Sequence, residues 1–181
     1  MRIKVTIRGV SPLLQHRFPD ADQIETKSRK RAGSRQEEDI EKSLYRLPDG
    51  VIYQPSEHIL GAMIRSASNF LIVGKRKKSY KELVKAVLFI EPECIVHKKQ
   101  KWGVDQRIVR IPPGTGAMVL RSRPRFENWE LDFTITTSEE QMAFETIKEI
   151  LDYAGRIVGI GDHRPRFGRF TVTRFEEENS K

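Results

Sequence analysis

The chain has 181 residues, with 33 Lys and Arg against 25 Asp and Glu, 38% apolar residues and one cysteine. This length and apolar content fit a single compact domain, and the net charge of +8 favours a polyanionic partner. The single Cys94 excludes an internal disulfide, and the longest apolar run, residues 83–90, is too short to span a bilayer. With no secretory leader in residues 1–10, we expect a cytoplasmic protein without a membrane partner.

Regular patterns predict the elements of the first half of the chain. Ile3, Val5 and Ile7 alternate with polar residues, which predicts a half-buried strand with a cationic outer face. The polar, Lys/Arg-rich segment 19–46 buries too little apolar surface to fold alone, and we expect a mobile basic insertion there. A short strand at 51–53 then leads to a helix capped by Ser56. The apolar stripe of that helix consists of Ile59, Met63, Ala67 and Phe70.

The second half alternates strands and helices. Capping-box spacing at Ser79-x-x-Glu82 predicts a short helix, and a Pro-Pro-Gly-Thr-Gly turn predicts a hairpin at 104–124. Alternation over 130–136 predicts another strand, and a second capping box at Ser138-x-x-Gln141 precedes the helix with the strongest apolar periodicity. A last strand at 170–173 is expected to put Phe170 in the core.

This order of elements predicts an α+β fold. Without the hairpin at 104–124, it is βαββαβ, the ferredoxin-like (RRM-like) arrangement, in a single domain over residues 1–175. We expect the insertion at 19–46 to follow the first strand, and a polar, frayed tail at 176–181.

The sequence offers no pattern for a metal or an organic cofactor. The four histidines are widely separated, and neither Cys-x-x-Cys nor His-x-x-x-His occurs. Gly159-x-Gly161 follows a predicted helix, whereas a dinucleotide fingerprint must follow a strand, and Arg164 replaces its third glycine. We therefore expect no cofactor.

The glycine-rich segment 159–170 carries the strongest functional pattern. Its glycines would let backbone amides approach an anion, Arg164, Arg166 and Arg169 offer planar forks for phosphate, and Phe167 offers a face to a base. The alternative reading is a well-packed turn with Phe167 in the core.

Other cationic runs extend the candidate surface if folding brings them to one face. Taken singly, each run is more typical of a solvated loop than of a binding site. The candidate nucleic-acid-binding residues in these runs are Arg29, Lys30, Arg31, Lys75, Arg76, Lys77 and Lys78.

Three segments resemble a known family. They are Val10-Ser11-Pro12-Leu13, the stretch from Tyr53-Gln54-Pro55-Ser56 to Gly61 and Arg65, and the glycine-rich loop before the last strand. Together they resemble the repeat-associated mysterious protein (RAMP) superfamily, the RRM-like subunits of CRISPR effector complexes, and the last segment also resembles phage and prophage proteins. The resemblance implies that Ser56, Arg65 and the loop 159–169 face nucleic acid and that the insertion acts as a mobile finger.

The function favoured by these observations is non-catalytic binding of single-stranded RNA or DNA, with self-association or other complex subunits along the strand. Tyr45, Trp102 and Phe167 are the candidates for stacking on bases. One alternative is a metal-independent endoribonuclease of the repeat-processing type that uses His16 or His163 as its acid–base group. Another is an assembly subunit whose basic face binds an acidic protein.

Overall fold

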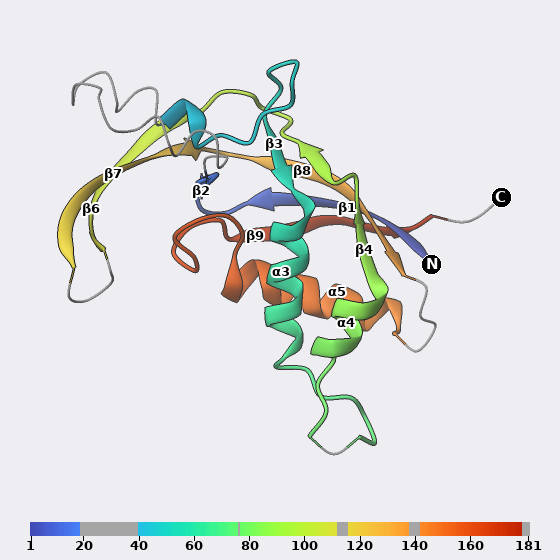
Figure 1. The fold of residues 1–181 in the computed structure, drawn as a ribbon. Helices are drawn as coiled ribbons and strands as arrows, with labels where there is room; N and C mark the ends of the chain where they lie inside the picture. The colour runs from blue at the N-terminus through green and yellow to red at the C-terminus, as the bar shows by residue number, and fades with distance from the viewer. Residues whose placement is uncertain (19–39, 76, 112–115, 138–141, 179–181) are drawn as a thin grey trace.

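The computed structural model describes residues 1–18, 40–75, 77–111, 116–137 and 142–178. Four antiparallel strands form its central sheet in the order β4-β8-β1-β9 (Figure 1). The strands are β1 (Arg2–Gly9), β4 (Leu88–Glu91), β8 (Glu130–Thr137) and β9 (Phe170–Glu177). The α+β class predicted from the sequence is therefore confirmed.

The alternation in β1 sets the two faces of this sheet. Ile3, Val5 and Ile7 lie opposite Ile135, Phe133 and Leu131 of β8, and all six side chains are buried. The residues between them point to the other face, where Arg8 lies opposite Glu130. The predicted strand is present, but the expected cationic outer face is wrong, because acidic residues of neighbouring segments pair with Lys4 and Arg8 there.

The helices lie on the apolar face of the sheet (Figure 1). They are α3 (Ser56–Ala67), α4 (Lys81–Val87) and α5 (Phe144–Tyr153), which continues into a π-helical turn, η2 (Ala154–Val158). The hydroxyl of Ser66 in α3 donates a hydrogen bond of 2.7 Å to the carbonyl of Ile150 in α5. None of the helices in the described ranges is long and apolar enough to cross a membrane.

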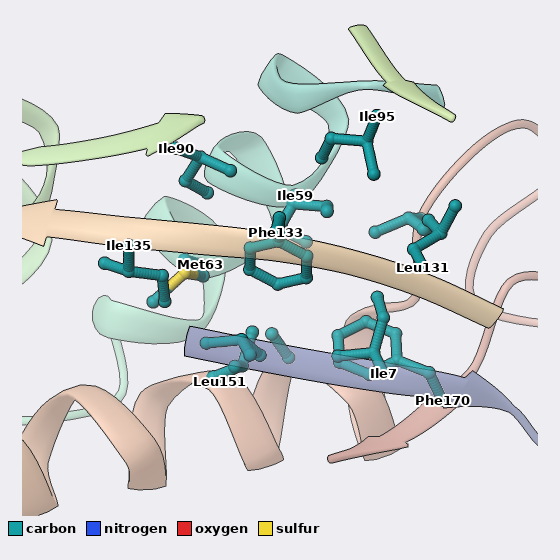
Figure 2. Close-up of a cluster of buried hydrophobic side chains, with 14 of the residues drawn as sticks. Ile7, Ile59, Met63, Ile90, Ile95, Leu131, Phe133, Ile135, Leu151 and Phe170 are labelled. Atoms are coloured by element: carbon teal, nitrogen blue, oxygen red, sulfur yellow. The ribbon is translucent and has the colours of Figure 1, made fainter. Parts of the chain in front are cut away.

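One hydrophobic core fills the space between sheet and helices. Figure 2 shows Ile59 and Met63 of α3 and Leu151 of α5 directed toward Phe133 and Ile135 of β8. Phe170, at the start of β9, is also buried, as the sequence predicts. The apolar stripe of the first predicted helix is therefore its core-facing side.

Shorter strands extend the molecule beyond the central sheet. A hairpin formed by β6 (Gly103–Ile111) and β7 (Ala117–Phe126) projects to the left of the sheet in Figure 1. β2 (Leu13–Leu14) pairs with the base of β7, and β3 (Tyr53–Pro55) pairs with β5 (Cys94–Val96). The sequence predicts the hairpin, but β2 and β5 are too short to produce a readable alternation.

The predicted helix caps are wrong. The N-cap of α3 is Pro55, and Ser56 is the buried first residue of the helix, its N–H donating to the Glu93 carbonyl at 2.9 Å. The N-cap of α4 is Tyr80, without a side-chain cap. Ser56 lies one position inside the helix, and its N–H extends the pairing of β3 with β5, so its hydroxyl is not in the position of a cap. The Ser138 cap lies outside the described residues.

Two segments expected to be exposed are partly packed. Residues 19–39 of the predicted insertion lie outside the described residues, but in its last part, 40–46, Ile40 and Leu44 are buried. The predicted tail is shorter than expected, because β9 continues to Glu177 and the Glu178 N–H donates to the Arg2 carbonyl at 2.8 Å. In both segments a few apolar or backbone contacts hold residues that the polar composition alone predicts to be exposed.

Candidate nucleic-acid interface

The hairpin has two chemically different faces. Residues directly opposite each other in an antiparallel pair share a face, so the pairs Asp105–Arg123 and Arg107–Arg121 lie together on one side. The pair Ile108–Leu120 lies on the other side, where Ile108 is 68% exposed. The hairpin therefore has one face with a cluster of charged side chains and another that exposes apolar side chains beside Gln106, Ser122 and Arg110; we refer to them as the charged face and the apolar face.

Asp105 organises the charged face. Its carboxylate accepts hydrogen bonds from Arg107 Nε at 2.6 Å and Nη2 at 2.9 Å, and Arg125 Nη1 lies 3.5 Å away. The hydrogen bonds from Arg107 lower the pKa of Asp105, and the positive charges of Arg107 and Arg125 add to this effect against the cost of burial. Asp105 therefore stays ionised and fixes the arginines around it.

An ion pair joins the hairpin to the loop that precedes β9. Arg123 Nε donates to the carboxylate of Asp162, and the Arg123 side chain is only 9% exposed. Burial alone would raise the pKa of Asp162, but the hydrogen bond and charge of Arg123 outweigh it, and the pKa is lowered. Asp162 is therefore an anion that anchors the loop to β7.

Most backbone amides of the glycine-rich loop already donate to other groups of the protein. Asp162 N–H donates to the Leu14 carbonyl at 2.8 Å, Gly168 N–H to the Pro12 carbonyl at 2.8 Å, and Ile160 N–H to the Gly168 carbonyl at 2.9 Å. Gly161 has a φ of +76°, and a Cβ there would lie 2.5 Å from the Leu14 carbonyl oxygen. The glycines serve close packing, and the predicted amide cradle for phosphate is wrong.

Phe167 does not offer a face for stacking on a base. Its side chain is 5% exposed, and the guanidinium of Arg107 covers the ring at 4.7 Å from the centroid. This cation–π contact connects the loop to the hairpin a second time. The alternative reading from the sequence, a packed turn, is correct for Phe167.

The arginines of the loop remain at the surface. Arg164 and Arg166 are exposed, and Arg169 uses its Nε to donate to the Pro165 carbonyl at 2.9 Å. Burial and the positive charge of Arg65 on α3 lower the pKa of Arg164. Within the described part of the chain, neither Arg65 nor Arg164 forms an ion pair. The negative charge of Asp162 also acts on Arg164 and offsets part of this repulsion, but two neighbouring cations outside an ion pair still favour a phosphate.

The remaining predicted binding residues do not all join this group. Ser56 is buried, so it does not face a ligand. Lys75, Lys77 and Lys78 lie in the loop after α3, at the opposite end of that helix from the hairpin (Figure 1). Arg29, Lys30, Arg31 and Arg76 lie outside the described residues.

The outer face of the central sheet is not a basic surface. Lys4 pairs with Glu178 at 2.9 Å, Arg8 pairs with Glu130 at 3.0 Å, and Lys98 pairs with Asp132 at 2.8 Å. Opposite charges on neighbouring strands neutralise one another there. Where α3 meets the glycine-rich loop, by contrast, the charges of Arg65 and Arg164 act on one another, and neither forms an ion pair among the described residues.

The two candidate catalytic histidines have different surroundings. Arg121 Nη1 donates to His16 Nε2 at 2.6 Å, and His16 Nδ1 is buried with no partner among the described residues. Burial lowers the pKa of His16, and Arg121 lowers it further. Neither ring nitrogen of His16 is therefore free to meet a substrate. His163 is exposed, with its ring 5.7 Å from that of Phe167.

Several residues of this interface were not among the sequence candidates. Asp105, Arg107, Arg121 and Arg123 hold the charged face of the hairpin, and Asp162 connects it to the loop. The signal was present in the sequence, because charged residues occupy every second position at 105–107 and 121–125. Alternation in a predicted hairpin places such residues on one face.

The described ranges contain no group of three or more His, Cys, Asp or Glu side chains that could hold a metal ion. No family model and no curated protein matches the chain.

Proposed function

We propose that this protein binds single-stranded nucleic acid without catalysing a reaction on it, along the junction of α3, the glycine-rich loop and the charged face of the hairpin. The observation that carries the proposal is the neighbouring pair Arg65 and Arg164, which lack ion-pair partners within the described ranges. Phosphates of a bound strand would bridge these two cations and extend toward Arg166.

We also propose that the core is ferredoxin-like. The sheet order β4-β8-β1-β9, with α3 and α4 before β4 and α5 before β9, supports this assignment. The resemblance of the chain to RAMP subunits agrees with such a core and with a nucleic-acid partner.

The apolar face of the hairpin supports self-association along the strand. Ile108 and Met118 are 68% and 65% exposed, and Val104 and Leu120 are about half exposed on the same face. A second copy bound beside the first would remove this surface from water. The charged face would remain turned toward the strand.

The test is a titration of fluorescently labelled single- and double-stranded DNA and RNA oligonucleotides at increasing salt. We expect single strands to bind, with a log–log salt slope of roughly −4 for about six phosphate contacts. Arg164→Ala should weaken binding and make the slope shallower by about 0.7. Arg174→Ala is the matched control, because Arg174 already pairs with Glu176 on the sheet. A response that does not depend on salt would overturn the proposal.

A metal-independent endoribonuclease is the second candidate, favoured by the exposure of His163 beside Arg164. In that case labelled RNA incubated with EDTA is cleaved, and His163→Ala abolishes the cleavage. Intact RNA after incubation supports the binding protein. A third outcome would support the assembly subunit. If heparin displaces a bound protein partner but oligonucleotides do not, the basic face binds an acidic protein.

A further inference from the structure

An open pocket of about 280 Å³ lies where β3, β5 and the start of α3 meet. It is next to the candidate nucleic-acid interface, because the charges of Arg164 and Asp162 act on His58 in its wall. The residues that line it are Tyr45, Tyr53, Pro55, Glu57, His58, Glu93 and Cys94.

Three aromatic rings form one side of the pocket. The rings of Tyr45 and Tyr53 are 5.8 Å apart at 61°, and those of Tyr45 and His58 are 5.4 Å apart at 86°. Each edge-to-face contact occupies only one face of one ring, so other aromatic surface remains for a flat ligand. Both tyrosine hydroxyls keep their protons at neutral pH, since burial raises the pKa of each.

A buried chain of hydrogen bonds fixes the tautomer of His58. The Tyr45 N–H donates to Gln15 Oε1 at 3.1 Å, so Gln15 Nε2 must be the end that donates to the Tyr53 carbonyl and to Gln54 Oε1. Gln54 Nε2 therefore faces His58 and donates to its Nδ1. With Nδ1 accepting, the neutral ring carries its proton on Nε2 and offers that N–H as a donor.

Acidic and basic groups flank the rings. Glu57 and Glu93 are exposed at the rim and supply hydrogen-bond acceptors. The positive charge of Arg17 acts on both tyrosines, and that of Arg164 acts on His58. The pocket thus combines aromatic faces, donors and carboxylate acceptors with cations on the side toward the proposed path of the strand.

We propose that this pocket takes one unstacked base of the bound strand and prefers a base with an exocyclic amino group. The inference rests on the proposed function and adds base selection to it. The base stacks on Tyr53, its amino group donates to Glu93, and Arg164 holds the adjacent phosphate. Carboxylates accept readily from the N4 amino group of cytosine, whereas thymine and uracil offer a carbonyl at that position and are repelled.

Charges of both signs border the pocket. Glu57 and Glu93 line it and Asp162 acts on Tyr45 and His58, while the positive charges of Arg17 and Arg164 reach the same rings. A nucleotide can use both signs, because its base donates to a carboxylate and its phosphate meets an arginine. A volume of about 280 Å³ is at the small end of ligand sites and suits a single base rather than a larger cofactor.

The experiment compares 12-nucleotide oligo(dC), oligo(dT) and an abasic strand of equal length with the full chain. We expect oligo(dC) to bind roughly tenfold more tightly than the abasic strand, the size of one base–aromatic stack, and more tightly than oligo(dT). Glu93→Gln should remove most of the preference for oligo(dC) over oligo(dT). Tyr53→Leu should remove most of the preference for an intact strand, with the salt slope unchanged because no phosphate contact is lost.

Tyr80→Leu is the matched control, since Tyr80 lies at the N-terminus of α4, beyond the other end of α3. The Tyr80→Leu variant should keep both the preference for oligo(dC) over oligo(dT) and the preference for an intact strand over the abasic strand. Near-ultraviolet circular dichroism of each variant verifies that the fold is intact.

The two proposals fail in different ways. If the wild-type chain binds none of the strands, the proposed function is wrong. If it binds all three strands equally with a steep salt slope, strand binding stands and the base pocket is wrong. The same holds if Glu93→Gln and Tyr53→Leu leave the preferences for oligo(dC) and for an intact strand unchanged.

Discussion

Arg123 on β7 and Asp162 in the loop before β9 form an ion pair that connects the hairpin to the central domain. The Arg123 side chain is 9% exposed and that of Asp162 is 34% exposed. Water can therefore solvate the charge of Asp162 better than that of Arg123, which depends more on the ion pair. Arg123 Nη1 is buried and has no other acceptor among the described residues. Loss of Asp162 would therefore remove the ion-pair partner of a buried cation and leave it only the longer-range charge of Asp105.

Asp162→Asn is expected to destabilise the protein by about 1 to 3 kcal/mol, less than a fully buried pair because Asp162 is partly in water. The free energy of unfolding in urea measures this loss. Glu176→Gln breaks the exposed Arg174–Glu176 pair and should cost less than about 1 kcal/mol. Equal costs for the two variants would show that the Arg123–Asp162 contact does not hold the hairpin in place.

Stability should fall as the pH decreases from 6.5 toward 4 because of His97. Burial lowers the pKa of His97 from 6.5 to about 4, and its ring stacks on Phe126 at 4.6 Å. In this range the unfolded chain binds a proton that the folded protein excludes, so acid favours unfolding. The free energy of unfolding measured at several pH values between 4 and 7 gives the slope.

His97→Phe is expected to reduce that slope. The burial of His16 and His58 also lowers their pKa values, so some pH dependence remains in this variant. The packing against Phe126 is retained, and Gln15 keeps its bonds to Tyr53 and Gln54. An unchanged slope would mean that His97 is accessible to protons in the folded state.

Phe167→Leu should leave nucleic-acid affinity within about twofold while lowering stability by about 1 to 2 kcal/mol. The physical reason is that Phe167 is buried under Arg107 and has no face open to a base. Anisotropy titration and urea unfolding give the two quantities. A large loss of affinity with unchanged stability would restore the stacking role suggested by the sequence.

Two glycines in helical segments are expected to respond in opposite ways to alanine. At Gly155 in η2 an added Cβ would overlap the Phe170 carbonyl oxygen, and Gly155→Ala should cost about 1 to 3 kcal/mol. At Gly61, on the exposed side of α3, nothing lies within 4 Å of an added Cβ. Gly61→Ala should therefore stabilise the protein by about 0.5 to 1 kcal/mol. Thermal unfolding distinguishes the two, and a destabilising Gly61→Ala would contradict the open space at that position.

Secondary-structure elements with a strong hydrophobic period could be predicted from the amino-acid pattern alone. The alternation of Ile3, Val5 and Ile7 predicts β1, and the stripe of Ile59, Met63 and Ala67 predicts the core face of α3. These predictions succeed because the period of a strand or helix is a local property that one segment carries. The predicted cap of α3 was wrong because the pairing of β3 with β5, a contact between distant segments, sets where the helix begins.

Which polar side chains come together in a site depends on contacts between distant segments, and these could be seen only in the folded protein. Phe167 is buried because Arg107, 60 residues earlier in the sequence, covers its ring. The tautomer of His58 is fixed by a chain of hydrogen bonds that runs from Gln15 through Gln54. The composition of the glycine-rich loop suggests an anion cradle, but its amides are taken by Pro12, Leu14 and Gly168. Hydrogen-bond satisfaction and burial depend on contacts between segments far apart in the chain, and no local pattern in the sequence records them.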